Sequence, residues 1–292
     1  MPSPLAESRI AAEGTCRSYD AREDNPYGYL PSIAPGVVFS VLFGSSMLWH
    51  AYQAYRTRTP WLWVLVVGGL GEVIGWVARS VATACSYSVP LFQMQLAALI
   101  ISPTFITAGI YIVLSRIIPL VGTDKSPLRP KFYLYIFIAV DIISLAVQAA
   151  GGGKAAAAFA KETDTKVGTN IMVAGIIFQM VSIIVFELLF CLVTFKALPQ
   201  IRASRSLSLL CGATTISVAA ILVRSVYRTI ELLQGWRGYL ITRERYFIAL
   251  DGAMIVVALV VYNALNPGEL LRKMELEKMK DPTPGGRLDE EK

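Results

Sequence analysis

The sequence predicts an all-α membrane protein, a bundle of seven transmembrane helices with its N-terminus outside and its C-terminus in the cytosol. Composition is the first reason, because 54% of the 292 residues are hydrophobic and 16% are charged, whereas a soluble domain carries about 25% charged residues. The second reason is that seven apolar runs each reach the roughly 20 residues that a bilayer core requires. The third is the uneven distribution of lysine and arginine between the loops, which sets the orientation.

The seven apolar runs follow one another with short polar connections. Residues 1–30 are polar and lack the apolar stretch of a signal peptide, so the first helix is expected to act as the targeting signal. We therefore expect an extracellular N-terminal segment over 1–30, a membrane domain over 31–265 and a cytosolic tail over 266–292. The seven spans are expected at residues 31–52, 60–82, 90–114, 132–151, 170–196, 207–232 and 246–265.

Proline and glycine mark where several of these helices are expected to end. Three prolines within residues 115–131 predict that this connection is not helical throughout. The glycine run at 151–153 is expected to end the fourth helix, ahead of a short alanine-rich surface helix. In the tail, one helical face would carry Leu270, Leu271 and Met274. That segment either lies along the inner leaflet or is a solvated, partly helical tail.

Basic residues gather in every second connection. The connections after the first, third and fifth spans carry Lys or Arg, and so does the tail, whereas the 83–89 loop carries none. Since basic loops stay cytosolic, this pattern places the N-terminus outside. The net charge of +6 is then a signal of topology. No separate basic soluble module exists, so a nucleic-acid partner is not expected.

The four cysteines fall in two environments. Cys191 and Cys211 lie inside apolar helices, where cysteine packs as a small hydrophobic residue. Cys16 and Cys85 both fall on the expected outer side, where disulfides persist. A bridge between Cys16 and Cys85 and two unpaired thiols are about equally compatible with the sequence.

Charged residues inside the predicted spans are the feature most informative about function. Arg224, Arg228 and Glu231 are spaced four and three apart, which places them on one helical face. Asp251 lies a little way inside the next span. An ionisable group at membrane depth costs roughly 2.5–3.5 kcal/mol when unpaired. These groups are therefore expected to pair and to face the bundle interior or a water-filled cavity.

Further polar residues occur at similar depth in the other helices. Glu72 and Arg79 are two turns apart in the second span, and Glu187 lies deeper in the fifth. Most of the set falls in the outer half of the membrane, which predicts a charge-lined pocket open to the outside. For any single residue, locking helices together at about 0.6 kcal/mol per bond is the alternative. The expected pocket residues are Glu72, Arg79, Asp141, Gln148, Gln179, Arg224, Arg228, Glu231 and Asp251.

Missing residues and motifs exclude several classes of protein. His50 is the only histidine, so a histidine-rich zinc site cannot form, and no metal site is expected. No phosphate-binding glycine loop, G-x-S-x-G sequence or cysteine-pair motif occurs. We therefore expect a protein that is not an enzyme and that needs no cofactor.

The motifs that carry these charges also resemble a known family. The second span contains GEVIGWVAR, the fourth has Asp141 and Gln148, and the block from Arg224 to Asp251 crosses the sixth and seventh. Together they resemble the fungal lipid-translocating exporter family, which is named for resistance to aminocholesterol and includes sphingoid long-chain-base resistance proteins. The resemblance spans about residues 27–270. It implies a multi-pass protein in the plasma membrane or an internal membrane of a fungus.

The resemblance implies that membrane lipids or amphipathic small molecules are the partners, with sphingoid bases as the first candidates. In that hypothesis the carboxylates of Glu231, Asp251 and Asp141 attract the ammonium group, while the arginines keep these acids ionised. A receptor-like lipid sensor is a first alternative. A porphyrin or haem transporter is a second, with Trp76 and Tyr227 as candidate stacking aromatics.

Overall fold

The computed structural model describes residues 16, 19–20, 25–161, 163–235 and 238–280, and among them it contains helices and their connections but no strand. Within them, seven helical segments are long and apolar enough to cross a membrane, as the sequence predicts. The first six are α2 (Ile33–Thr57), α3 (Trp63–Ala82), α4 (Val89–Val121), α5 (Pro130–Ala160), α6 (Lys166–Lys196) and α8 (Arg205–Leu233). The seventh begins with α9 (Glu244–Tyr246), passes through the π-helical segment η3 (Phe247–Gly252) and continues as α10 (Ala253–Ala264).

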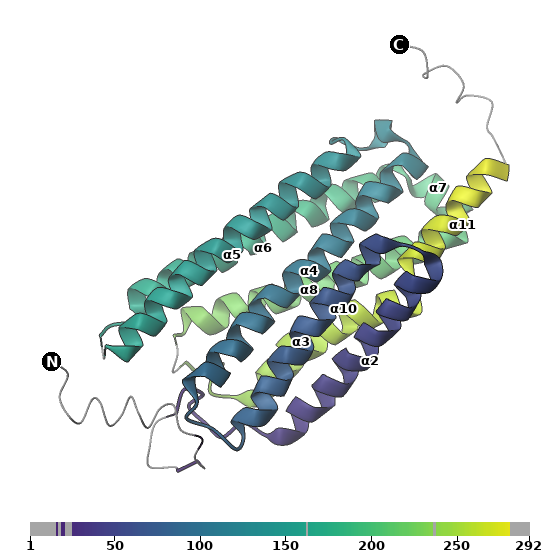
Figure 1. The fold of residues 1–292 in the computed structure, drawn as a ribbon. Helices are drawn as coiled ribbons and strands as arrows, with labels where there is room; N and C mark the ends of the chain where they lie inside the picture. Colours follow the sequence, from purple (N-terminus) through teal and green to yellow (C-terminus); the bar gives the residue numbers. More distant parts are fainter. Residues whose placement is uncertain (1–15, 17–18, 21–24, 162, 236–237, 281–292) are drawn as a thin grey trace.

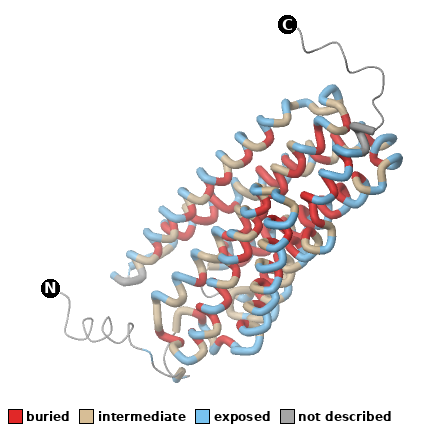
Figure 2. The backbone as a smooth tube through the Cα atoms, turned by 45° about the vertical axis from the view of Figure 1, so that its right-hand side comes forward, coloured by how far each residue is buried: buried red, intermediate tan, exposed pale blue. Residues whose placement is uncertain are grey.

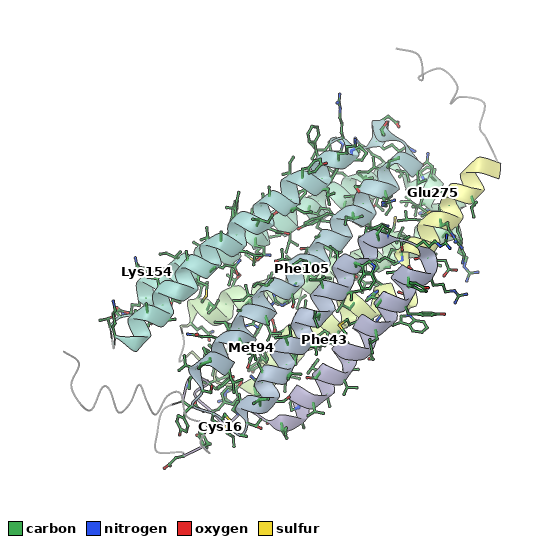
Figure 3. All side chains as sticks on the ribbon, in the orientation of Figure 1. Cys16, Phe43, Met94, Phe105, Lys154 and Glu275 are labelled. Atoms are coloured by element: carbon green, nitrogen blue, oxygen red, sulfur yellow. A yellow bond between two sulfur atoms is a disulfide. The ribbon has the colours of Figure 1, made fainter. Side chains whose placement is uncertain are left out.

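Three short elements connect these helices at the end of the bundle away from Cys16, namely η1 (Pro60–Leu62), η2 (Thr123–Lys125) and α7 (Leu198–Ala203). The final helix α11 (Pro267–Lys280) lies at the same end. Figure 3 shows Glu275 of α11 at one end of the bundle and Cys16 at the other. The bundle therefore has two distinct ends, one carrying the disulfide and one carrying α11.

The helices pack mainly against their neighbours in the chain. α3 packs between α2 and α4, α5 packs along α6, and α8 touches α4, α6 and α10. Figure 1 shows α5 and α6 running side by side along one flank of the bundle. α11, α7 and η3 also contact α8, which carries the charged face predicted from the sequence.

The outer surface of the bundle is apolar. Figure 2 shows buried positions gathered on the inner side of the helices and exposed positions on the outer side. Large exposed side chains include Val41 at 63%, Leu188 at 60% and Ile142 at 59%. A continuous apolar surface of this kind marks contact with a membrane. The polar residues of each helix therefore avoid lipid by lying on the face that points into the bundle.

Glycine permits the closest helix contacts. A Cβ atom on Gly75 of α3 would lie 2.5 Å from Leu99 Cδ2 of α4. On Gly168 of α6 it would lie 2.7 Å from both Ala155 Cα and Gly151 O of α5. Small residues let membrane helices approach closely, because lipid supplies no hydrophobic force between them.

The prediction that glycines end the fourth helix is wrong. α5 continues through residues 151–153 to Ala160, and the alanine-rich segment is its last part. Glycine costs a helix about 1 kcal/mol relative to alanine. At Gly151 the missing side chain leaves room for the backbone of Gly168 and Met172 in α6, so the contact between the two helices offsets that cost.

The tail begins as a helix that packs on the bundle. Leu270, Leu271 and Met274 of α11 are 9%, 4% and 6% exposed and belong to the main apolar core. The predicted apolar face exists, but protein covers it instead of lipid or water. α11 contacts α2, α4 and α8, so it closes the end of the bundle opposite the disulfide.

Candidate functional site

The centre of the site is an ion pair between α8 and η3. Arg228 donates two parallel hydrogen bonds to Asp251, from Nε to Oδ1 at 2.7 Å and from Nη2 to Oδ2 at 2.8 Å. Its third nitrogen, Nη1, donates to Oε2 of Glu231 at 3.1 Å. The three side chains are at most 7% exposed. Bidentate ion pairs between arginine and a carboxylate are among the strongest hydrogen-bonded contacts in proteins.

A second guanidinium group reaches the same aspartate. Arg224 Nε lies 2.9 Å from Asp251 Oδ1, and Arg224 Nη2 donates to the backbone carbonyl of Leu99 in α4. Tyr227 donates to Oε1 of Glu231 at 2.7 Å. Asp251 is therefore the shared partner of two arginines, and its carboxylate ties α8 to the seventh helix.

The π-helical segment η3 sets the position of Asp251. A π-turn adds a residue to the helix and often occurs at functional sites. Gly252 follows Asp251, and a Cβ atom there would lie 2.5 Å from the ring of Trp76. The absence of a side chain lets η3 pack directly against α3, which brings Asp251 toward the arginines of α8.

Arg79 forms a second ion cluster nearer the disulfide end. Its Nη2 donates to Oε1 of Glu244 and to the hydroxyl of Tyr29, both at 2.7 Å. Glu244 also accepts from the backbone N–H of Ser32 at 2.9 Å and from its hydroxyl at 2.6 Å. These contacts join α3, the start of the seventh helix and the segment before α2.

One aromatic ring links the two clusters. The Phe247 ring centroid lies 4.8 Å from the guanidinium carbon of Arg79 and 5.1 Å from that of Arg228. Cations within about 6 Å of a ring face are attracted to it. Phe247 therefore lies between two positive groups and belongs to both clusters.

The segment before α2 covers this region. Tyr27 donates to Oε1 of Gln95 in α4 at 3.0 Å and is 5% exposed. Burial raises the pKa of both Tyr27 and Tyr29 above the usual value for a phenol, so the two hydroxyl groups stay neutral at physiological pH. Two neutral phenols thus form the polar cover over Arg79.

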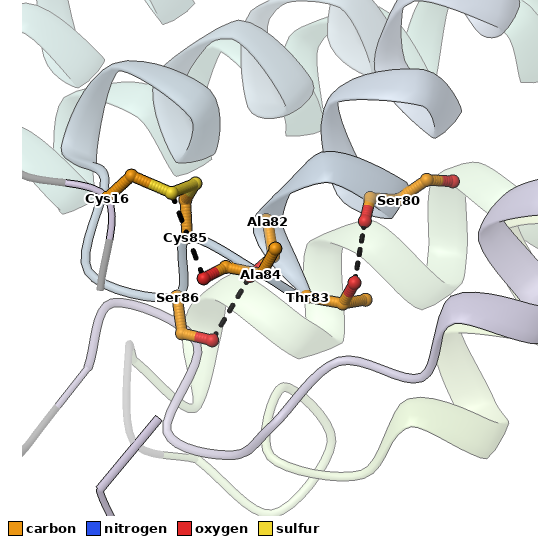
Figure 4. The surroundings of a disulfide bond; sticks show 7 residues. All are labelled: Cys16, Ser80, Ala82, Thr83, Ala84, Cys85 and Ser86. Carbon is orange, nitrogen blue, oxygen red and sulfur yellow. Dashed lines mark hydrogen bonds between the residues drawn. A yellow bond between two sulfur atoms is a disulfide. The ribbon is translucent and has the colours of Figure 1, made fainter. Parts of the chain in front are cut away.

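A disulfide fixes the start of the same cover. Cys16 is joined to Cys85 in the turn after α3, where Thr83 Oγ1 donates to Ser80 O at 2.8 Å and Ser86 Oγ donates to Ala82 O at 3.1 Å (Figure 4). The turn is thereby held by its own side chains. Cys16 is thus attached at Cys85, and Ser32 at Glu244.

We expect peptide mapping without reduction to recover Cys16 and Cys85 in one linked species that reduction separates. Cys85→Ser should abolish that species and lower the melting temperature. A link between residues 69 apart restricts the unfolded chain, and such bridges are typically worth about 2–4 kcal/mol. Cys211→Ser, at a free buried thiol, is the control and should leave the linked species intact. Recovery of unlinked Cys16 and Cys85 from the oxidised wild type would contradict this pairing.

Arg228 lines two small cavities. The first, about 40 Å³, opens under the tyrosine cover and is lined by Arg79, Gln95 and Glu231 among others. The second, about 20 Å³, lies between α4, α5, α6 and α8, where Gln148 and Gln179 line it. One water molecule needs roughly 10–15 Å³ by this measure. In this conformation the cavities therefore hold water or a small head group, and a lipid chain needs the helices to move apart.

The structure brings most of the predicted pocket residues together. Arg224, Arg228, Glu231 and Asp251 are in direct contact, as described above. Gln148 donates to Gln179 at 3.1 Å, and both line the second cavity. Arg79 and Glu72 lie beside the network, since Arg224, Arg228 and Asp251 are the charged groups near Glu72.

Asp141 lies apart from this group. Its Oδ2 accepts from Thr107 of α4 at 3.2 Å, and it lines neither cavity. Glu187 is also separate, with the thiol of Cys191 3.6 Å from its Oε1. Within the described residues, no group of three His, Cys, Asp or Glu side chains could hold a metal ion.

Several residues of the site were not predicted. Glu244 is not among the predicted pocket residues, yet it is the partner of Arg79. Tyr29 and Phe247 were not singled out, because nothing in the sequence around them indicates a contact with arginine. Tyr227 was considered only as a stacking aromatic, although its spacing of four from Glu231 is the signal for the hydrogen bond that it makes.

Comparison with known proteins adds a family match and three informative relatives. The sequence profile described as RTA1 like protein matches residues 65–274. The chain is 30% identical over 278 residues to the sphingoid long-chain base transporter RSB1 of Saccharomyces cerevisiae, covering 82% of this chain and 73% of that protein. It is 27% identical to protein RTM1 of the same organism, covering 68% and 64%.

A third relative has a different cargo in its name. The chain is 24% identical over 277 residues to protoporphyrin uptake protein 1 of Saccharomyces cerevisiae, covering 81% of this chain and 90% of that protein. No solved structure matches the chain. The region matched by the profile contains Arg79, Arg224, Arg228 and Asp251, so these members of the ion network lie within the family match.

Proposed function

We propose that this chain, which belongs to the family of RTA1-like proteins, translocates sphingoid long-chain bases or similar cationic amphiphiles across a membrane. The observation that carries the proposal is Glu231. It is a buried carboxylate that lines the first cavity beside Arg228, at the end of the bundle covered by Tyr27 and Tyr29. A relative named as a sphingoid long-chain base transporter matches over 82% of this chain.

The chemistry of the cavity suits an ammonium head group. A sphingoid base carries one positive charge and hydroxyl groups on a single alkyl chain. Glu231 offers a carboxylate to the charge, and Gln95 and Tyr27 offer amide and phenol groups to the hydroxyls. The alkyl chain can stay among the apolar surfaces of the helices, because lipid surrounds the bundle.

We further propose that the disulfide end faces outside and the α11 end faces the cytosol, in the plasma membrane. The disulfide supports this orientation, because disulfides persist in oxidising compartments. The basic residues of the connections at the α11 end support it as well. With that orientation the cavity opens toward the exterior leaflet, where an exported base would leave.

The porphyrin alternative has a relative in its favour but less support from the site. Trp76 is fully buried and stacks on Phe39 with ring centroids 4.3 Å apart. Tyr227 is held by Glu231. Neither ring lines a cavity, so these two aromatics offer no free face to a flat macrocycle in this conformation.

Transport of a labelled sphingoid base into liposomes that contain the purified protein tests the proposal. We expect the wild type to move the base, and Glu231→Gln to lower the initial rate at least about tenfold, because the ammonium loses its charge partner at a desolvated site. Asp141→Asn, a buried acid outside both cavities, is the matched control and should keep most of the rate.

Two outcomes would overturn the proposal. Binding of the base by the wild type without transport would favour a lipid sensor. Transport of a porphyrin in place of the base would favour a porphyrin transporter. Thermal unfolding of each variant in detergent shows whether a loss of rate reflects a loss of folded protein.

A further inference from the structure

Glu72 is the one carboxyl group near the ion network that forms no ion pair among the described residues. It lies in the middle of α3 and is 1% exposed. Its Oε1 atom is buried without a hydrogen-bond partner, and no described cation forms an ion pair with it. The indole of Trp76, one turn further along α3, is a neutral donor beside it and supplies no charge. The rest of the network is well paired, so Glu72 needs a separate explanation.

The formal charges of the network balance without Glu72. Three guanidinium groups belong to it, and each is paired. Arg79 pairs with Glu244, Arg224 with Asp251, and Arg228 with both Asp251 and Glu231. Three positive charges therefore meet three negative ones. An ionised Glu72 would add a fourth negative charge to a network that is already neutral.

The surroundings of Glu72 make that fourth charge costly. The charged groups near it are Arg224 and Arg228 from α8 and Asp251 from η3. α4 faces this part of α3 with the side chains of Leu99 and Ser102, and α2 faces it with Met47. A buried carboxylate without a partner of its own is expensive and is usually neutralised. A neutral, protonated Glu72 avoids that cost.

We propose that Glu72 carries the proton that the protein exchanges for a cationic cargo. This inference rests on the proposed function. An ammonium group that enters the cavity beside Glu231 adds one positive charge to a balanced network. Loss of the proton from Glu72 restores the balance, since its new carboxylate is close to Arg224 and Arg228. One proton leaves as one cation binds, so the bound site keeps its net charge and the exchange across the membrane is electroneutral.

The charge on the cargo decides the experiment. A sphingoid base can lose its own proton and cross a bilayer as a neutral amine, which imitates exchange with protons. We therefore choose the N,N,N-trimethyl derivative of a labelled sphingoid base, whose charge is permanent. Liposomes without protein then give the leak.

The first measurement is proton release in weakly buffered detergent solution. We expect the wild type to release about one proton per protein on binding the trimethyl derivative. Glu72→Gln, which has the shape of a protonated glutamate, should bind the derivative and release none. Asp141→Asn should release protons like the wild type. Binding by the wild type without release would overturn the inference and leave the proposed function standing.

The second measurement is transport driven by a pH gradient. One-for-one exchange predicts a tenfold accumulation of the derivative for each pH unit, because that gradient equals 1.36 kcal/mol. A membrane potential set with potassium and valinomycin should have no effect on the wild type. In Glu72→Gln the pH gradient should lose its effect, and transport should become sensitive to the potential because the cation then moves alone.

The results separate the two proposals. Absence of both binding and transport by the folded wild type would overturn the proposed function and this inference together. Transport that ignores the pH gradient would overturn only the exchange. Retention of the tenfold accumulation by Glu72→Gln would show that another group carries the proton.

Discussion

Asp251→Asn is expected to destabilise the folded protein by about 3–5 kcal/mol, the range for breaking a buried ion pair by removal of one partner. The asparagine keeps the size of the side chain but leaves Arg224 and Arg228 facing a neutral amide. Glu231 remains as a single carboxylate for Arg228. The measurement is thermal unfolding of the purified protein in detergent, with expression at the membrane as a second readout.

Asp141→Asn is the matched control for this change. Asp141 is as deeply buried as Asp251, at 1% against 2%, but it accepts a hydrogen bond from the hydroxyl of Thr107 and pairs with no described cation. An amide oxygen can accept the same bond, so we expect a loss below about 1.5 kcal/mol, the usual worth of a single hydrogen bond. Equal losses for the two variants would mean that the arginines do not depend on Asp251.

Gly168→Val is expected to separate α5 from α6. The new side chain would meet the backbone of Ala155 and Gly151, with its Cβ 2.7 Å from Ala155 Cα. Backbone atoms cannot turn away as a flexible side chain can. The cost should therefore reach or exceed the upper end of the about 1–3 kcal/mol known for overpacking. Thermal unfolding in detergent measures it.

Gly153→Val provides the comparison on the same pair of helices. No atom lies within 4 Å of the position that its Cβ would occupy. The variant should therefore unfold at nearly the wild-type temperature. A melting temperature for Gly168→Val that matches Gly153→Val would show that the two helices can pack without the close contact.

The features that sequence predicted well are local along the chain. Hydropathy locates seven spans, because each must supply about 20 apolar residues on its own. Helical spacing places Arg224, Arg228 and Glu231 on one face, because that geometry needs no knowledge of other helices. The contact with Asp251 was also within reach, since the sixth and seventh spans are consecutive and a buried charge needs a partner.

The features that sequence missed depend on where cavities form along the helices and on how connections fold back. Asp141 and Gln148 are seven residues apart on one face of α5, and only Gln148 lines a cavity, because two helical turns separate them along the axis. The pairing of Arg79 with Glu244 requires the start of the seventh helix to lie against the end of α3. The glycine run at 151–153 predicts the end of a helix, and only the contact between α5 and α6 explains why α5 continues through it.

Phe247 and its neighbours join the cover of the site to its centre. Glu244 and Asp251 belong to one short stretch of chain, Glu244–Gly252, with Phe247 between them. Glu244 accepts a hydrogen bond from Ser32 in the segment before α2, and Asp251 pairs with Arg224 and Arg228 of α8. A movement that separates Ser32 from Glu244 would therefore displace the helical stretch that also carries Asp251. Opening of the first cavity at the surface would then be coupled to a change in the ion pairs of the interior.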